Sequence, residues 1–169
     1  MSENNLIVKV SNLKKYFPIK KGVFSKTTDY VKAVDDVSLE IERGKTLGLV
    51  GESGSGKTTL GKTIIKLHEP TSGTIEFNGT DITSYKSRDL RELRKEIQII
   101  FQNPYGSLNP RMNIESIISE GLIIHNIVKK KEARDYVVDL LEQVGLNSDM
   151  INRYPHEFSG GQRQRIAIA

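Results

Sequence analysis

Hydrophobic and polar positions alternate over short runs in the first part of the chain. Residues 6–10 are rich in β-branched side chains, apolar residues alternate with polar ones over 37–42, and the alternation over 74–77 ends at an Asn78-Gly79 pair. A period of two predicts half-buried strands, and Asn-Gly predicts a tight turn between strands. The basic stretch 18–30, which contains glycine and proline, is interpreted as a surface loop.

Two mainly apolar runs differ from these strands. Residues 46–50 and 97–101 are nearly continuous in their hydrophobicity, which predicts strands buried on both faces, as in a parallel sheet. A glycine-rich turn and a helix over 57–67 are expected after the first run, and a short basic helix over 88–95 before the second. The first part of the chain is therefore predicted to be mixed α/β.

Helical spacing dominates after residue 103. Apolar residues recur at near-helical spacing over 114–124, and an amphipathic pattern over 133–144 stops at Gly145. We expect the apolar face of 114–124 to belong to an internal core rather than to a partner surface. The change of pattern predicts two domains, residues 1–103 and residues 104–169.

Composition narrows the possible partners. Among 169 residues, 25 Lys and Arg against 21 Asp and Glu give a net charge of +4, and cysteine and tryptophan are absent. The basic excess suits an anionic partner, and the lack of cysteine excludes disulfides, thiolate metal sites and cysteine nucleophiles. Few aromatic residues argue against a stacking surface for single-stranded nucleic acid. No apolar run approaches the ~20 residues that a membrane-spanning helix needs, so a membrane role would be peripheral.

Residues 51–58 match the pattern G-x-x-x-x-G-K-[ST] between a predicted strand and a predicted helix. Glycines let the backbone approach phosphate oxygens, and inward N–H groups at the positive end of a helix bind anions. Lys57 supplies a charge for the β- and γ-phosphates, and the Thr58 hydroxyl can ligate Mg²⁺. The predicted ATP-binding residues of this loop are Gly51, Glu52, Ser53, Gly54, Ser55, Gly56, Lys57, Thr58 and Thr59.

A second glycine-rich helix start lies in Phe158-Ser159-Gly160-Gly161-Gln162. Ser159 is the expected N-cap, and the backbone amides that follow it predict a second anion site. Taken alone, the segment is also compatible with an ordinary capped helix. Gln102 stands at the end of the apolar run 97–101, where glutamine by itself is unremarkable.

Together these motifs resemble the ATP-binding cassette (ABC) ATPases. Residues 51–58 are similar to the Walker A motif, Gln102 to the Q-loop glutamine, and 158–162 to the signature, with Phe158 where leucine is commonest. Residues 101–111 and 18–22 are similar to the ATP-binding subunits of oligopeptide and dipeptide importers. The resemblance implies an α/β P-loop NTPase with a RecA-like core, an antiparallel β subdomain and a helical subdomain. Residues 1–103 would be the nucleotide-binding core and 104–169 the helical signature subdomain.

The resemblance also implies roles for individual residues. Phe17, by its offset from Leu13, would stack on adenine, with Tyr16 as the fallback. Gln102 would sense the γ-phosphate and Mg²⁺, and would serve catalysis together with Lys57. The signature residues Ser159, Gly160, Gly161 and Gln162 would bind the γ-phosphate of ATP that the opposing cassette holds.

The implied cofactors are ATP and Mg²⁺. The implied partners are a second ABC ATPase subunit, identical or homologous, transmembrane permease subunits and, indirectly, a peptide-binding protein; nucleic acid is not expected. The protein would lie at the cytoplasmic face of the cell membrane, as a peripheral subunit.

The sequence departs from the family at its end. It stops inside the helix that the signature opens, and His68, His125 and His156 do not match the family's switch histidine. The resemblance thus implies an N-terminal part, with an incomplete fold that lacks the Walker B strand and later strands. Two interpretations stay open: an ATPase subunit of a peptide importer, or of a related importer such as one for nickel, and a nucleotide-binding module without turnover. These 169 residues alone are expected not to hydrolyse ATP.

Overall fold

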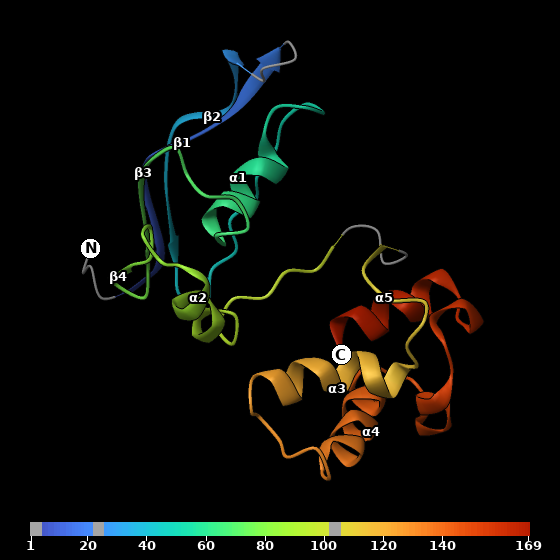
Figure 1. Ribbon diagram of the computed structural model, residues 1–169. Helices are drawn as coiled ribbons and strands as arrows, with labels where there is room; N and C mark the ends of the chain where they lie inside the picture. Colours follow the sequence, from blue (N-terminus) through green and yellow to red (C-terminus); the bar gives the residue numbers. More distant parts are fainter. Residues whose placement is uncertain (1–4, 22–25, 102–105) are drawn as a thin grey trace. The chain divides into compact units, whose positions relative to one another are not determined.

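The computed structural model describes residues 5–21, 26–101 and 106–169 (Figure 1). The chain divides into two units, the first ending at Leu90 and the second beginning at Arg91. The domain boundary predicted after residue 103 itself lies outside the described residues. Within the described ranges, no helix has the length and apolar character to cross a membrane.

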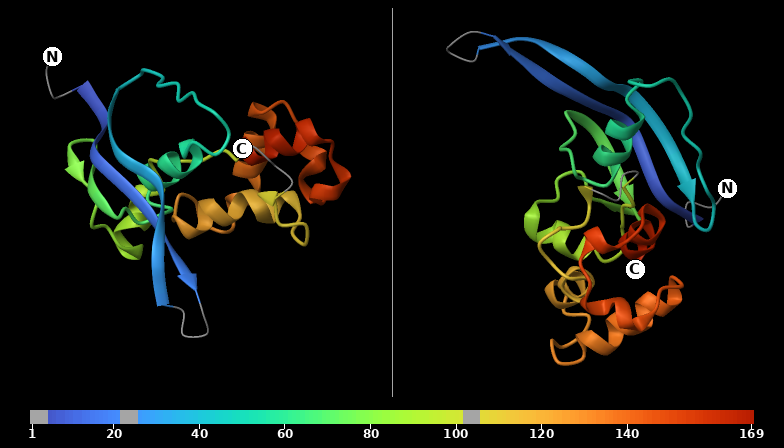
Figure 2. Two further views of the ribbon diagram at one scale, coloured as in Figure 1. Left: turned by 90° about the horizontal axis from the view of Figure 1, so that it is seen from above. Right: turned by 90° about the vertical axis from the view of Figure 1, so that its right-hand side faces the viewer.

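Over the described part of the first unit, the sheet has four antiparallel strands in the order β2-β1-β3-β4. The strands are β1 (Leu6–Lys21), β2 (Lys26–Glu42), β3 (Ser72–Phe77) and β4 (Thr80–Asp81). The first two pair as one long, curved hairpin, from Leu6 opposite Glu42 to Lys21 opposite Lys26 (Figure 2). The expected antiparallel β subdomain is therefore present.

The stretch 18–30 is mostly strand, so its interpretation as a surface loop is wrong. β1 continues to Lys21 and β2 begins at Lys26, with Pro18 opposite Tyr30. β3 pairs with β1 only from Val8 to Lys14. Pro18 thus lies beyond that pairing, where β1 has β2 on one side alone, and proline is tolerated at such an edge because a missing N–H breaks no ladder bond there.

The turn predicted at Asn78-Gly79 is confirmed. Asn78 and Gly79 have φ of 50° and 74°, the left-handed values that a tight hairpin turn needs at both positions. Phe77 then faces Thr80 across the turn. Ile75 and Phe77 are buried while Thr74 is exposed, as the alternating pattern predicted.

Helix α1 (Lys57–Ile64) packs against β1 and β2 in the first unit (Figure 1). Leu60 and Thr63 are its buried residues. The helix ends three residues earlier than the predicted range 57–67, because Lys66 takes a left-handed conformation with φ of 58°. Among the sheet side chains whose burial the structure describes, the buried hydrophobic ones are Val10, Leu13, Val34, Ile75 and Phe77.

The two continuous apolar runs, 46–50 and 97–101, lie outside regular secondary structure. Their prediction as strands buried on both faces is wrong: Val50 is 94% exposed and Phe101 45%. A parallel strand needs neighbours whose N–H and C=O groups pair with its own. No strand among the described residues pairs with either run, which agrees with the incomplete fold, lacking the Walker B strand and later strands, that the resemblance implied.

The second unit is helical. Following α2 (Ser87–Leu93), which spans the boundary between units, it contains α3 (Ile114–Ile124), α4 (Ala133–Gln143), the short 3₁₀ helices η3 (Ser148–Asn152) and η4 (Pro155–Glu157), and α5 (Gly160–Ile168). α2 corresponds to the short helix predicted over 88–95. α3 and α4 confirm the helices predicted from the apolar spacing, and Asn113 begins α3 by accepting a hydrogen bond from the Ser116 amide at 2.9 Å.

One hydrophobic core holds the second unit together. Ile114 and Ile118 of α3 meet Val137 and Leu141 of α4 in this core. The apolar face of α3 is therefore internal, as expected, although Ile124 at its end is exposed. Phe158, which immediately precedes the glycine-rich start of α5, is also part of the core.

Candidate functional site

The predicted phosphate-binding loop, residues 51–58, leads directly into α1. Gly56 is the N-cap of the helix, with φ of 93°, and it has no side chain to occupy the unpaired N–H groups of the first turn. That turn, Lys57-Thr58-Thr59-Leu60, contains no acidic residue. The helix start therefore combines unpaired backbone donors with the positive end of the helix dipole, which favours an anion.

Gly56 also lies against β2. A Cβ on Gly56 would lie 2.1 Å from the carbonyl oxygen of Ala33, far closer than any real contact. The positive φ and this close approach both require glycine. The backbone of the loop therefore packs directly against the sheet at Ala33, at one edge of the site.

Lys57 turns its side chain back into the loop. Its ammonium donates to the Gly51 carbonyl at 2.8 Å, to the Ser55 hydroxyl at 3.3 Å and also to the Glu52 carbonyl. These bonds close the loop around a positive charge. The same charge is the one that a bound phosphate would meet.

A cavity of about 430 Å³ opens at this loop. It is lined by Val31, Lys32 and Ala33 from β2 and by residues 54–59. The structure thus brings Gly54, Ser55, Gly56, Lys57, Thr58 and Thr59 together around one space. Gly51 and Glu52 take part through their carbonyls, which accept hydrogen bonds from Lys57, and Ser53, which follows them, is exposed.

The two candidate adenine-stacking residues have different surroundings on β1. The Phe17 ring meets His68 edge to face, with ring centroids 5.6 Å apart, and the Lys15 ammonium lies 4.8 Å from its centroid. Tyr16 donates its hydroxyl to Asp35 of β2. Phe17 has no polar group to satisfy, whereas Tyr16 is held by a side-chain hydrogen bond.

The hydrogen bond between Tyr16 and Asp35 shifts the pKa values of both side chains. The hydrogen bond raises the pKa of Tyr16 above its ordinary 10.0 and lowers the pKa of Asp35 below 3.8. The cause is the same for both: a neutral phenol beside an ionised carboxylate is the favoured pair of states. Lys32 adds to the effect on Asp35, at 3.7 Å from its carboxylate.

Of the two residues expected to ligate Mg²⁺ through oxygen, the structure describes only Thr58. Thr58 is exposed in the first turn of α1, so its hydroxyl fits a metal that prefers oxygen and takes most of its ligands from water and phosphate. Gln102, the other expected ligand, lies outside the described residues. Within the described ranges, no group of three or more His, Cys, Asp or Glu side chains is placed to hold a metal.

The second glycine-rich start forms the first turn of α5 in the other unit. Ser159 is its N-cap: its hydroxyl accepts from the Gln162 amide at 3.3 Å, and the Gln162 side chain accepts from the Ser159 amide at 3.0 Å. This is a capping box, a device the sequence analysis did not foresee although S-x-x-Q announces it. Gly160 and Gly161 sit between the two, and a Cβ on Gly161 would meet nothing within 4 Å.

Two arginines fasten the start of α5 to its own unit. Arg163 donates to the Phe158 carbonyl at 2.9 Å. Arg165 donates to the carbonyls of Val144 and Gly145 at the end of α4, at 3.3 and 3.2 Å. The aromatic ring of Phe158 is buried beneath this turn, so phenylalanine in place of leucine serves as a core residue.

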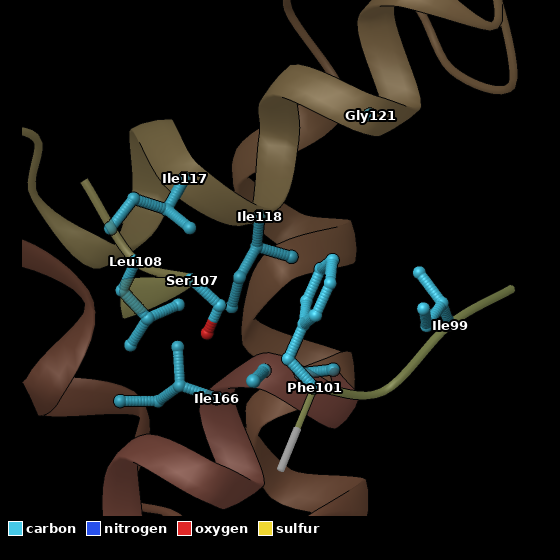
Figure 3. Close-up of a pocket in the computed structure, with 10 residues that line it drawn as sticks. Ile99, Phe101, Ser107, Leu108, Ile117, Ile118, Gly121 and Ile166 are labelled. Atoms are coloured by element: carbon cyan, nitrogen blue, oxygen red, sulfur yellow. The ribbon is translucent and has the colours of Figure 1, made fainter. Parts of the chain in front are cut away.

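A second cavity, of about 280 Å³, lies within the helical unit (Figure 3). Ile99 and Phe101 line it together with Ile118 of α3 and Ile166 of α5. The side chains that line it are apolar apart from the Ser107 hydroxyl, and none of them carries a positive charge for a phosphate. The cavity at the loop in the first unit is the better candidate for nucleotide.

Comparison with known proteins gives the family. The sequence profile of the ABC transporter family matches residues 34–169. A solved dimeric cassette, MJ0796 in a post-hydrolysis state bound to ADP and Pi, matches with a TM-score of 0.79 at 28% identity, over 95% of this chain and 67% of that one. The expected cassette fold is thus confirmed for the part of it that this chain covers.

Two curated relatives are named for peptide transport. The dipeptide transport ATP-binding protein DppF of Haemophilus influenzae is 51% identical over 169 residues, which are all of this chain and 51% of that protein. The oligopeptide transport ATP-binding protein OppF of Bacillus subtilis is 53% identical over 165 residues, or 96% of this chain and 52% of that protein. The chain spans about half the length of the curated relatives it matches. With a profile match over most of its length, the chain belongs to the ABC transporter family.

Proposed function

We propose that the protein is the ATP-binding subunit of an importer for oligopeptides or dipeptides. The proposal rests on one observation: about half of the residues, along essentially the whole chain, are identical to those of relatives named for dipeptide and oligopeptide transport. The glutathione import ATP-binding protein GsiA of Pectobacterium atrosepticum, 48% identical over 163 residues, is named for a short peptide too. A nickel importer remains the alternative that the transport experiment below separates.

The loop 51–58 would hold the triphosphate in the cavity lined by residues 54–59. Backbone N–H groups at the start of α1 bind phosphate oxygens, and the Lys57 ammonium exchanges its carbonyl partners for the β- and γ-phosphates. Thr58 and Gln102 would hold Mg²⁺, which when bound neutralises charge on the phosphates. Phe17 would stack on the adenine, since its ring has no hydroxyl that is engaged by another side chain.

The signature would act on a nucleotide held by another cassette. Ser159, Gly160, Gly161 and Gln162 would bind the γ-phosphate across a head-to-tail pair, and the match to a dimeric cassette structure supports such pairing. The pair would dock on permease subunits at the cytoplasmic face of the membrane, which receive the peptide from a binding protein. ATP hydrolysis would require both cassettes, because each composite site needs residues from two chains.

The test is transport by cells that lack the gene. Complementation with the intact gene should restore uptake of labelled di- and oligopeptides, and the Lys57→Ala version should not. Labelled nickel is the matched control and should enter equally in all strains. Restored nickel uptake with unchanged peptide uptake would replace the peptide proposal with the nickel one.

A further inference from the structure

Lys66, just beyond the end of α1, is an unusual residue in two respects. Its φ of 58° puts it in the left-handed region, which glycine adopts without strain. Its side chain is 0% exposed, although lysine is rarely buried. A strained backbone and a buried ammonium both cost free energy, and such features persist where the surrounding structure requires them.

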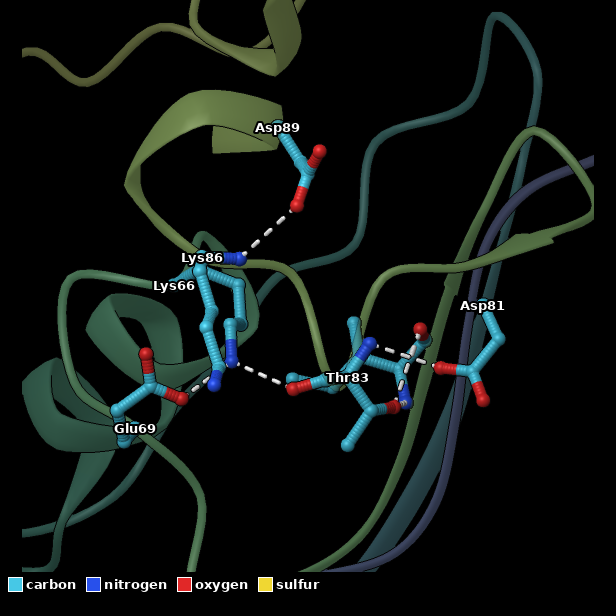
Figure 4. Close-up of polar contacts among 7 residues, drawn as sticks. Lys66, Glu69, Asp81, Thr83, Lys86 and Asp89 are labelled. Atoms are coloured by element: carbon cyan, nitrogen blue, oxygen red, sulfur yellow. Dashed lines mark hydrogen bonds and ion pairs between the residues drawn. The ribbon is translucent and has the colours of Figure 1, made fainter. Parts of the chain in front are cut away.

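The ammonium of Lys66 joins the end of α1 to the antiparallel sheet (Figure 4). It donates to the Thr83 carbonyl at 2.6 Å and forms an ion pair with Glu69 at 2.5 Å. Thr83 is itself fixed: its hydroxyl accepts from the Ile75 amide of β3 at 2.8 Å, and its amide donates to Asp81 at 2.8 Å. Lys66 thus anchors the helix end to Thr83, a residue just beyond β4 that is itself hydrogen-bonded to Ile75 of β3.

The segment that follows Lys66 reaches the candidate adenine site. The Thr71 amide donates to the Lys14 carbonyl at 2.7 Å, and the Thr71 hydroxyl accepts from the Tyr16 amide at 2.9 Å. His68 lies edge to face against the Phe17 ring. The residues from 66 to 71 therefore contact β1 at the position of the proposed base-stacking residue.

One continuous piece of chain therefore joins the two halves of the proposed site. α1 carries the phosphate-binding groups at its first turn, and the segment after its last turn contacts Phe17. Lys66, with its buried ammonium, lies between these two parts of the chain. We propose that Lys66 is a positioning residue, which holds the phosphate-binding loop and Phe17 at the separation that lets a nucleoside triphosphate use both. This inference rests on the proposed binding of ATP.

The expected consequence is selective. Loss of the Lys66 ammonium should weaken the part of the affinity that comes from the base, because the base and the phosphates can no longer be bound together in their best geometry. Binding of a phosphate chain without a base should change little. A role in general stability would instead weaken both ligands alike.

The experiment compares dissociation constants for ATP and for inorganic tripolyphosphate, both with Mg²⁺, in the intact protein. Lys66→Met keeps an unbranched chain as far as the Cε position and removes the ammonium; we expect the ATP constant to rise by about tenfold, which is within the contribution of a base–aromatic stack. The tripolyphosphate constant should stay within about twofold. Lys86→Met is the matched control, because Lys86 lies near the same cluster but is exposed, and it should change neither.

A second variant keeps the test decisive if Lys66→Met does not fold. Thr71→Val removes only the hydroxyl that holds the Tyr16 amide, at an exposed position, and should lower the ATP preference in the same direction. An unchanged ratio of the two constants in the folded variant, or an equal loss for both ligands, would overturn the inference alone. An intact wild-type protein that binds neither ligand would overturn the proposed function, and the inference with it.

Discussion

Gly56 and Ala33 are in such close approach that a methyl group on Gly56 would lie 2.1 Å from the Ala33 carbonyl oxygen. The contact seats the phosphate-binding loop on β2 at Ala33, a residue more than twenty positions before Gly56 in the chain. The contact also distinguishes Gly56 from Gly54, another glycine of the same loop. Gly54 has a similar φ, 84°, but a Cβ there would meet nothing within 4 Å.

Gly56→Ala should abolish measurable ATP binding, whereas Gly54→Ala should only weaken it. Both variants strain the backbone, by roughly 1–3 kcal/mol, but only the first forces the loop off β2. Titration with a fluorescent ATP analogue and thermal melting of the intact protein measure the two effects. Equal losses in both variants would show that the contact with Ala33 is unimportant for binding.

Lys57→Ala should weaken ATP binding and stop phosphate release in the intact protein. The variant removes the cation from the loop and leaves the Gly51 and Glu52 carbonyls without this donor. Lys62→Ala, on the same helix but distant from its first turn, is the control. Labelled-ATP binding and phosphate release that match wild type in Lys57→Ala would refute the assigned role of the loop.

Phe17→Ala should raise the ATP dissociation constant by about one to two decades, the range expected for loss of a base–aromatic stack. Tyr16→Ala should do less, because Tyr16 is occupied by Asp35. Calorimetric titration of both variants gives the ranking. A larger effect for Tyr16→Ala would move the adenine-stacking role to that residue.

Changes in the signature should damage turnover more than binding by one cassette. Ser159→Ala removes a helix cap, which costs about 1 kcal/mol of stability. Gly161→Asp places a carboxylate in the open space beside Gly161, where it would repel a γ-phosphate. Both variants should bind ATP as monomers and fail to release phosphate.

Mixing Gly161→Asp with Lys57→Ala subunits tests whether the signature acts on the opposing cassette. A mixed pair contains one composite site with both defects and one with neither, so partial activity should return. Each variant alone serves as the control. Mixtures that never exceed the activity of the single variants would argue for a signature that acts within its own chain.

The Tyr16–Asp35 hydrogen bond should make stability depend on acid pH. Because the pKa of Asp35 is lowered in the folded protein, its contribution is complete above the unfolded value near 3.8 and is lost as pH falls through the lower, folded value. Tyr16→Phe should therefore lose less stability than wild type on acidification below about pH 4. Urea melts at several pH values measure this, with the exposed Tyr30→Phe as control, and parallel curves for all three proteins would exclude the contribution.

Local signals in the sequence were enough for several elements and for much of the candidate site. Asn78-Gly79 specifies its turn by backbone preference, the spacing of apolar residues specifies α3 and α4, and Ser159 begins α5 as the expected N-cap. The composition of the loop 51–58 is also read from its own glycines and from Lys57 and Thr58, which begin the helix that follows. In each case the determining interactions join residues that are close in sequence.

Tertiary structure decided the features whose partners are distant. The strand pairing of 18–21 with 26–30, the exposure of Val50 and the contact between Gly56 and Ala33 depend on which strands are present to pair. No sequence pattern identified Lys66 as a buried residue, because the carbonyl that accepts its hydrogen bond belongs to Thr83, seventeen residues away. An apolar sequence indicates a tendency to be buried. Burial needs a second surface to pack against, and ladder hydrogen bonds need a neighbouring strand. Whether these are present depends on the tertiary structure.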